Sequence, residues 1–199
     1  DLRMSRGLGD VYKRQEQERI CRLIEKCRQG DTVAFASIVR EYQPLVYRLS
    51  FRLPCNEEEA RDITQDSFIK IWLSLAGYNP RYRFSTWIYR ITCNICCDRL
   101  RVLQRSPERR SISEVESSGL NLVSDTDPYV EMDNREVKDL ILKLTEGLSP
   151  KQKIVFILRD IEELDVDEIK EITGLSPEKI KSNLYLARKN IRDKLKSRL

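Results

Sequence analysis

The sequence predicts an all-α protein with two small helical domains joined by a flexible linker. Apolar residues recur at three- and four-residue steps along most of the chain, as they do on one face of an α-helix. Helix-capping residues precede these segments, and the alternating pattern of a strand is nearly absent. The helical period fails over residues 104–129, where Ser, Pro, Gly, Asn and Asp dominate. We therefore expect a flexible linker there, with two domains that move independently.

The composition is typical of a globular cytoplasmic protein. Of the 199 residues, 40% are hydrophobic and 34% are charged, so a core can form beneath a charged surface. No apolar run approaches the roughly 20 residues of a membrane span, and no signal peptide is seen. The six cysteines are expected to be reduced thiols. Cys93, Cys96 and Cys97 contain a CxxC spacing, but the chain has no His and no second close Cys pair, so we expect neither a metal nor a cofactor.

The first domain is expected at residues 16–103. Residues 1–15 do not begin with Met and show no helical period, so we interpret them as a non-native or disordered tail. A first helix starts near Gln17 and ends at Gly30. Asp31 caps a second helix, which Pro44 is expected to kink or break.

Two further helices complete this domain. Asn56 caps a third helix, with Glu59 at the capping-box position. Its expected buried face comprises Ala60, Ile63, Phe68, Ile71, Trp72 and Leu75. After a loop at Asn79 and Pro80, a fourth helix opens at Ser85. One of its sides is apolar, and another carries Arg90, Asn94, Cys97 and Arg101.

The second domain is expected at residues 130–199 and ends in a helix-turn-helix. Ser149 and Gln152 form a capping box, as do Asp165 and Glu168. Gly174 ends a short helix, and Ser176 caps a final helix that has an apolar face of Ile180, Leu184, Ala187, Ile191 and Leu195. From residue 170 to residue 199 there are nine Lys or Arg against three Asp or Glu. Such a helix can lie in a DNA major groove; the alternative is a core helix with a solvated basic face.

Three motifs in this order resemble those of extracytoplasmic-function (ECF, group IV) sigma factors of the sigma-70 family. The segment from Asp62 to Trp72 resembles their D-x-x-Q-D-x-F-x-x-x-W helix. The segment from Phe84 to Asn94, continuing to Asp98 and Arg99, resembles their F-x-T-W-L-x-R-I-A-x-N segment. Residues 148–152 and the final helix-turn-helix resemble the sigma-4 domain. The resemblance covers about residues 31–198 without the linker.

The resemblance implies a transcription initiation factor with a sigma-2-like and a sigma-4-like domain. Its partners would be core RNA polymerase, through the β′ clamp helices and the β flap, promoter DNA and an anti-sigma factor, with no stable homo-oligomer. The residues expected to bind core polymerase are Asp62, Gln65, Asp66, Ile69 and Lys70. Those expected at the −10 element are Tyr82, Arg83, Phe84, Trp87, Arg90, Asn94 and Arg101. Those expected at the −35 element are Lys179, Lys181, Ser182, Asn183, Tyr185 and Arg188.

Two positions depart from the family pattern, and two other functions compete. Lys170 stands where the family usually has a closely packed Ala, and Leu186 where some relatives have Arg. An ordinary helix-turn-helix regulator would leave the Asp62–Trp72 helix unexplained. A carboxylate-metal nuclease could use Glu59, Asp62 and Asp66, but no His or second carboxylate helix accompanies them. We expect no catalytic activity.

Overall fold

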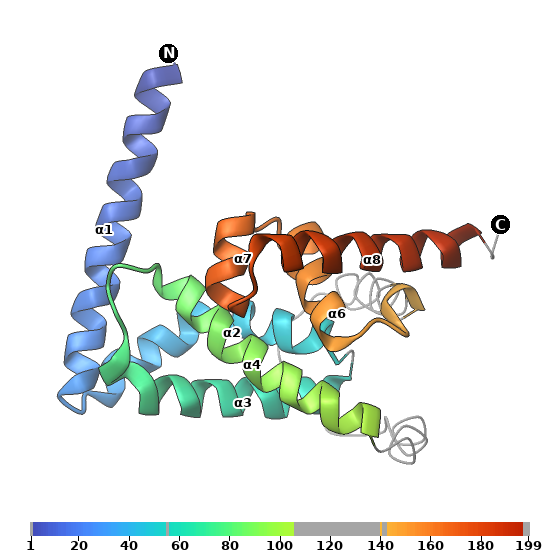
Figure 1. The fold of residues 1–199 in the computed structure, drawn as a ribbon. Helices are drawn as coiled ribbons and strands as arrows, with labels where there is room; N and C mark the ends of the chain where they lie inside the picture. The colour runs from blue at the N-terminus through green and yellow to red at the C-terminus, as the bar shows by residue number, and fades with distance from the viewer. Residues whose placement is uncertain (1, 55, 106–139, 141–142, 197–199) are drawn as a thin grey trace, which may run out of the picture.

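The structure is a computed structural model that describes the backbone of all residues except 1, 55, 106–139, 141–142 and 197–199, and the side chains of these except 2–14 and 104–105. Every regular element within this part of the chain is helical, in agreement with the all-α prediction. Figure 1 shows a bundle of helices with α1 standing at one side and α8 at the other. In chain order the elements are α1 (Leu2–Arg28), α2 (Thr32–Arg52), α3 (Glu57–Ser74), η1 (Leu75–Gly77), α4 (Phe84–Arg105), α6 (Pro150–Phe156), η3 (Ile157–Ile161), α7 (Val166–Thr173) and α8 (Pro177–Lys196).

Helix α1 is longer than the sequence predicts. It includes residues 2–15, which we interpreted from the sequence as a non-native or disordered tail, and its N-terminal part projects away from the bundle (Figure 1). Its C-terminal part is held by the buried side chains of Ile20, Ile24 and Cys27. Because adding turns to an existing helix is much easier than starting one, and no proline interrupts this segment, the helix continues outward.

Helix α2 continues through Pro44 to Arg52, so the proline does not break the helix. Asp31 caps the helix as predicted, with its carboxylate accepting from the Val33 and Ala34 amides at 2.9 and 3.0 Å. Ile38 lies before Pro44 and Val46 after it, and both are fully buried. Packing on both sides of the proline offsets a penalty of about 3 kcal/mol.

Helices α3 and α4 complete the N-terminal half around an aromatic and aliphatic core. Asn56 caps α3 by accepting from the Glu59 amide at 3.0 Å, and α4 begins at Phe84, one residue before the predicted Ser85. One cluster of buried residues from α1–α4 and the segment between α3 and α4 forms what we call the N-terminal core. Its members are Ile20, Ile24, Cys27, Ala34, Ile38, Val46, Phe68, Ile71, Leu75, Tyr78, Phe84 and Ile88.

The C-terminal half follows the capping signals of the sequence closely. Both predicted capping boxes, at Ser149 and at Asp165, are formed. Gly174 ends α7 in the left-handed conformation with φ of 68°, and the Ser176 hydroxyl accepts from the Lys179 amide at 3.4 Å. Between α6 and α7 the chain makes a π-helical turn, η3, which periodicity alone does not predict.

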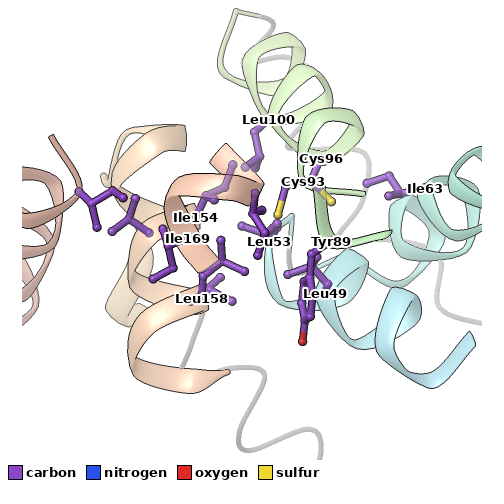
Figure 2. Close-up of a cluster of buried hydrophobic side chains, with 14 residues drawn as sticks. Leu49, Leu53, Ile63, Tyr89, Cys93, Cys96, Leu100, Ile154, Leu158 and Ile169 are labelled. Atoms are coloured by element: carbon purple, nitrogen blue, oxygen red, sulfur yellow. The ribbon is translucent and has the colours of Figure 1, made fainter. Parts of the chain in front are cut away.

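The two halves pack against each other through a second cluster, which we call the shared core. The N-terminal half contributes residues of α2, α3 and α4, and the C-terminal half contributes residues of α6, η3, α7 and α8 (Figure 2). Its members are Leu49, Leu53, Ile63, Tyr89, Cys93, Cys96, Leu100, Ile154, Val155, Ile157, Leu158, Ile169, Ile172 and Ile180. Independent movement of the halves was expected because the stretch between them is polar; instead, apolar faces of both are buried in one another.

The predicted linker lies outside the described residues, except that residues 104 and 105 end α4. Cys21, Cys27, Cys93, Cys96 and Cys97 are free thiols. Within the described ranges, no helix combines the length and the apolar character needed to cross a bilayer.

Candidate nucleic-acid interface

Helix α8 buries one face and leaves the predicted DNA-reading face in solvent. Ile180 and Ala187 are fully buried, and Ile191 is nearly so. Leu195, the last predicted apolar position, is 46% exposed. The Asn183 side chain is half-buried and donates to the Lys179 carbonyl at 2.7 Å. The other predicted −35 residues are all exposed: Lys179, Lys181, Ser182, Tyr185 and Arg188.

The two departures from the family pattern do not disturb this helix-turn-helix. Lys170 is exposed on α7 rather than wedged between the helices, and its carbonyl accepts the amide of Gly174 at 2.8 Å. Leu186 is 45% exposed on α8, on the flank that carries Tyr185.

The loop between η1 and α4 presents its tip to solvent. The Asn79 side chain accepts from the Arg81 amide at 3.0 Å, and the Asn79 carbonyl accepts from the Tyr82 amide at 3.1 Å. These bonds form a tight turn after Asn79. Tyr82 is 48% exposed and Arg83 is exposed, so both are available to nucleic acid.

Phe84 is buried and cannot contact DNA, so its prediction as a −10 contact is wrong. Its side chain is 1% exposed and lies among three aromatic rings, with centroids 5.3 Å from Tyr42, 5.1 Å from Tyr78 and 5.5 Å from Trp87. A base cannot stack on a ring that is enclosed in this way. Trp87 is half-buried against the same core and keeps only part of its ring accessible.

Farther along α4 the predicted polar stripe is exposed. Arg90, Asn94 and Arg101 follow each other at four and seven residues and therefore share a face. Arg101 also pairs with Asp98 at 2.7 Å, an exposed contact on the same helix. Arg83, which directly precedes α4, and this stripe together form a surface that carries basic and amide side chains.

The predicted polymerase-docking face of α3 is exposed as well. Its members are Asp62, Gln65, Asp66, Ile69 and Lys70. Leu73, which is not among the predicted docking residues, is 72% exposed and lies one turn beyond Ile69, which is 50% exposed. Ile69 and Leu73 are aliphatic residues at i and i+4 on an otherwise polar helix face, and this spacing is the sequence pattern that indicates Leu73 as part of the same surface.

Two acidic residues of α3, Glu59 and Asp66, lie beside an arginine. Arg99 lies 3.1 Å from Glu59 and 3.8 Å from Asp66. Among the residues that the structure describes, no group of three His, Cys, Asp or Glu could hold a metal ion.

Residues 160–168 of the C-terminal half form an acidic segment that pairs with one arginine of α8 and with one arginine of the loop before α4. Asp160 pairs with Arg188 at 2.6 Å, and Glu168 pairs with Arg83 at 3.3 Å. Two predicted DNA contacts are therefore also ion-paired with this acidic segment. The hydrogen bonds that Arg188 donates to the Asp160 carboxylate raise the pKa of Arg188.

Glu162 is the most buried acid of this segment, and it is not among the predicted site residues. Its side chain is 5% exposed; it contacts Arg48 at 3.1 Å, pairs with Arg52, and accepts from the Tyr89 hydroxyl at 2.7 Å. Burial raises the pKa of Glu162, but the hydrogen bonds from Arg48 and Tyr89 and the two positive charges outweigh it and lower the pKa overall. The partners lie far away in the sequence, so no local pattern marks this residue.

Comparison with other proteins assigns the family. Sequence models of Sigma-70 region 2 and of Sigma-70, region 4 match residues 38–106 and 138–191. The ECF RNA polymerase sigma factor SigW of Bacillus subtilis is 31% identical over 183 residues, which is 87% of this chain and 95% of the relative. The chain belongs to the ECF sigma factors of the sigma-70 family. It is therefore a factor that binds core RNA polymerase and directs it to promoters, and sigma factors are not catalytic enzymes.

Solved structures agree with the fold of this ECF sigma factor. CnrH, in a complex with the cytosolic domain of CnrY, is 18% identical, with a TM-score of 0.62 over 91% of this chain and 98% of that chain. The sigma factor RpoE of Bartonella quintana, in a complex with the anti-sigma factor NepR, is 21% identical, with a TM-score of 0.58 over 81% of this chain and 96% of that chain.

Proposed function

We propose that this ECF sigma factor reads a −35 element with α8 and holds a melted −10 element with the loop before α4 and the exposed stripe of α4. In the same arrangement α3 docks on the β′ clamp helices and the C-terminal half on the β flap. The factor promotes DNA opening and performs no chemistry itself, because nucleotide transfer belongs to the polymerase.

The observation that carries the −35 assignment is the one-sided burial of α8. Ile180 and Ala187 seat the helix, while Lys181, Ser182 and Tyr185 stand in solvent near its N-terminal end. A recognition helix of a helix-turn-helix places its N-terminal residues against base edges. Lys181 and Ser182 can donate hydrogen bonds to base edges in the major groove, and Arg188, farther along α8, can reach a backbone phosphate.

The −10 assignment is supported by surface chemistry of a different kind. Single-stranded DNA is bound by aromatic faces on which bases stack and by cations that follow the backbone. Tyr82 offers such a face, Arg83 and Arg90 offer the cations, and Asn94 offers an amide that can hydrogen-bond an unstacked base. Phe84 supports the site from beneath as a core residue.

An anti-sigma factor is the expected regulator. Both structural relatives described above were solved with a partner protein, and one of those partners is an anti-sigma factor by name. The exposed face of α3 with Ile69 and Leu73 is a surface that either polymerase or such a partner could cover.

The test separates the two DNA contacts with Lys181→Ala, Asn94→Ala and the control Lys151→Ala, which removes an exposed lysine of α6. Gel shifts on −35 duplex measure docking, and permanganate footprinting of the holoenzyme on a promoter measures opening. We expect Lys181→Ala to weaken duplex binding by about 1–3 kcal/mol, as for a base-edge contact. Asn94→Ala should spare duplex binding and reduce opening and −10 base discrimination. Equal loss of duplex binding in both variants, with opening of a pre-bound complex unchanged, would contradict the assignment.

A further inference from the structure

Residues 78–83, the loop between η1 and α4 for which we propose −10 binding, are hydrogen-bonded to α1 at both ends of the loop. At the end nearer α4, the Gln17 side-chain amide donates to the Tyr78 hydroxyl at 2.8 Å, to the Pro80 carbonyl at 3.1 Å and to the Tyr82 carbonyl at 3.3 Å. The Tyr78 hydroxyl in turn donates to the Tyr82 carbonyl at 2.7 Å. Gln17 and Tyr78 thus converge on the backbone of the residue whose ring faces solvent.

At the other end, Arg28 fastens the start of the loop. Its guanidinium donates to the carbonyls of Leu75 at 3.2 Å, Ala76 at 3.4 Å and Tyr78 at 3.2 Å. These carbonyls belong to η1 and the residue after it, where helix ends leave acceptors without intrahelical donors. Arg28 therefore caps η1 from a different helix.

Gln17 and Arg28 stand at the two ends of one buried stripe of α1. Ile20 and Ile24 are 1% and 2% exposed, and Gln17 precedes Ile20 by three residues, whereas Arg28 follows Ile24 by four. Because Gln17 and Arg28 flank the buried stripe, α1 places one side-chain donor at each end of the loop. Gln17 lies before residue 38, where the match to Sigma-70 region 2 begins.

We propose that Gln17 is a positioning residue for −10 recognition, which fixes the backbone of Pro80 and Tyr82 so that the Tyr82 ring meets an unstacked base. This inference rests on the proposed −10 function of the loop. Gln17 acts through the loop and does not itself contact DNA.

The bonds of Gln17 to Pro80 and Tyr82 are exposed, so water can replace the lost donor when the side chain is shortened. Removing Gln17 should therefore cost little folding stability but leave the loop tip free to adopt other conformations. Loss of one positioning hydrogen bond corresponds to about a 2- to 12-fold effect on binding of the single strand.

The experiment uses the full chain assembled with core polymerase and three variants of Gln17. Gln17→Ala removes the donor, Gln17→Glu places a carboxylate against two carbonyl oxygens, and Gln17→Lys restores a donor of similar reach. The control is Arg22→Ala, which removes an exposed residue of the same helix that pairs only loosely with Glu18, at 3.8 Å. The probe is a single-stranded −10 oligonucleotide with the preferred base and with each of the other bases at the central position.

We expect Gln17→Ala and Gln17→Glu to lower affinity for the preferred oligonucleotide by about 2- to 12-fold and to flatten the ratio between bases. Gln17→Lys should retain most of the ratio between affinity for the preferred base and affinity for the other bases. For this variant the ratio is compared instead of the affinity itself, because an added positive charge increases affinity for any DNA. Duplex −35 binding, core polymerase binding and melting temperature should stay at wild-type values for all three. Unchanged base discrimination in Gln17→Ala would overturn the inference, and so would parallel losses in −35 binding and melting temperature.

Tyr82→Ala distinguishes failure of this inference from failure of the proposed function. If Tyr82→Ala abolishes −10 discrimination while Gln17→Ala does not change it, the positioning role alone is overturned. If Tyr82→Ala has no effect either, the loop is not the −10 site and both proposals fall.

Discussion

The Tyr89 hydroxyl donates a 2.7 Å hydrogen bond to the Glu162 carboxylate, and this bond joins the two halves of the protein across 73 residues of sequence. Arg48 and Arg52 reach the same carboxylate from α2. One acid of the C-terminal half is thus held by two helices of the N-terminal half, directly beside the shared core. We therefore treat Glu162 as the main polar contact between the halves.

Glu162→Gln should destabilise the protein by about 1.5–3 kcal/mol in a denaturant titration, the range for hydrogen bonds to a charged group. The amide keeps the shape of the side chain but loses the charge that Arg48 and Arg52 surround, and its N–H groups face donors. Glu163→Gln is the matched control, because Glu163 is the neighbouring acid and is exposed. Equal free energies of unfolding for the two variants would contradict the role of Glu162.

The same contact predicts how stability depends on pH. The pKa of Glu162 is lower in the folded protein than its ordinary value. A lowered carboxyl pKa contributes stability that is fully present above the unfolded pKa, about 4.3, and is lost as pH falls through the folded pKa. The difference in free energy of unfolding between wild type and Glu162→Gln should therefore be constant near neutral pH and shrink below about pH 4.3. A difference that grows on acidification would show the opposite sign and exclude this linkage.

Cysteine reactivity should report separation of the halves. Cys93 and Cys96 are buried in the shared core, and burial raises the pKa of Cys96 to about 12 and that of Cys93 well above its ordinary value. Since the thiolate is the reactive form, both should react with a thiol reagent far more slowly than the half-buried Cys21. Mass spectrometry after timed labelling measures each site. In Glu162→Gln we expect faster labelling of Cys93 and an unchanged rate at Cys21.

Gly174→Ala tests the turn of the helix-turn-helix. Gly174 has φ of 68°, and a Cβ there would meet no atom within 4 Å, so the only penalty is the left-handed backbone. That conformation costs an L-residue about 1–2 kcal/mol. Gly77→Ala, which has the same open surroundings without a positive φ, should be neutral or slightly stabilising. Calorimetry of both variants checks the contrast.

Asp66→Arg should weaken binding of core polymerase and leave the melting temperature unchanged. Asp66 is 54% exposed, and its contact with Arg99 is long, at 3.8 Å, so little stability depends on it. A reversed charge at a complementary interface commonly costs several kcal/mol of affinity. Glu171→Arg makes the same change of charge at an exposed position of α7. Wild-type affinity for core polymerase in Asp66→Arg would remove α3 from the docking surface.

The features that the sequence predicts well are those with local causes. Asp31, Asn56, Ser149 and Asp165 cap their helices because a side chain bonds an amide two or three residues away. Gly174 could be identified in the same way, since its φ depends on the turn alone. Exposure of the predicted faces of α3 and α8 follows from helical period.

The features that it misses depend on distant packing. Glu162 has partners 73 to 114 residues away, which no window of sequence contains. Phe84 looks like a DNA contact because it adjoins Tyr82 and Arg83, but the position of Tyr42 and Tyr78 turns it inward. Pro44 remains inside α2 for a similar reason, because buried neighbours on both sides hold the helix.

The long separation between Arg48 and Glu162 has a consequence during synthesis. Arg48 and Glu162 are 114 residues apart. A ribosome adds about 5–20 residues per second, so Arg48 of α2 leaves the exit tunnel roughly 6–23 s before Glu162, with which it pairs. During that time Leu49 and Leu53, and later Cys93 once it has emerged, have no C-terminal half to cover them. The nascent chain therefore displays an apolar surface beside two arginines until the C-terminal half emerges to cover it.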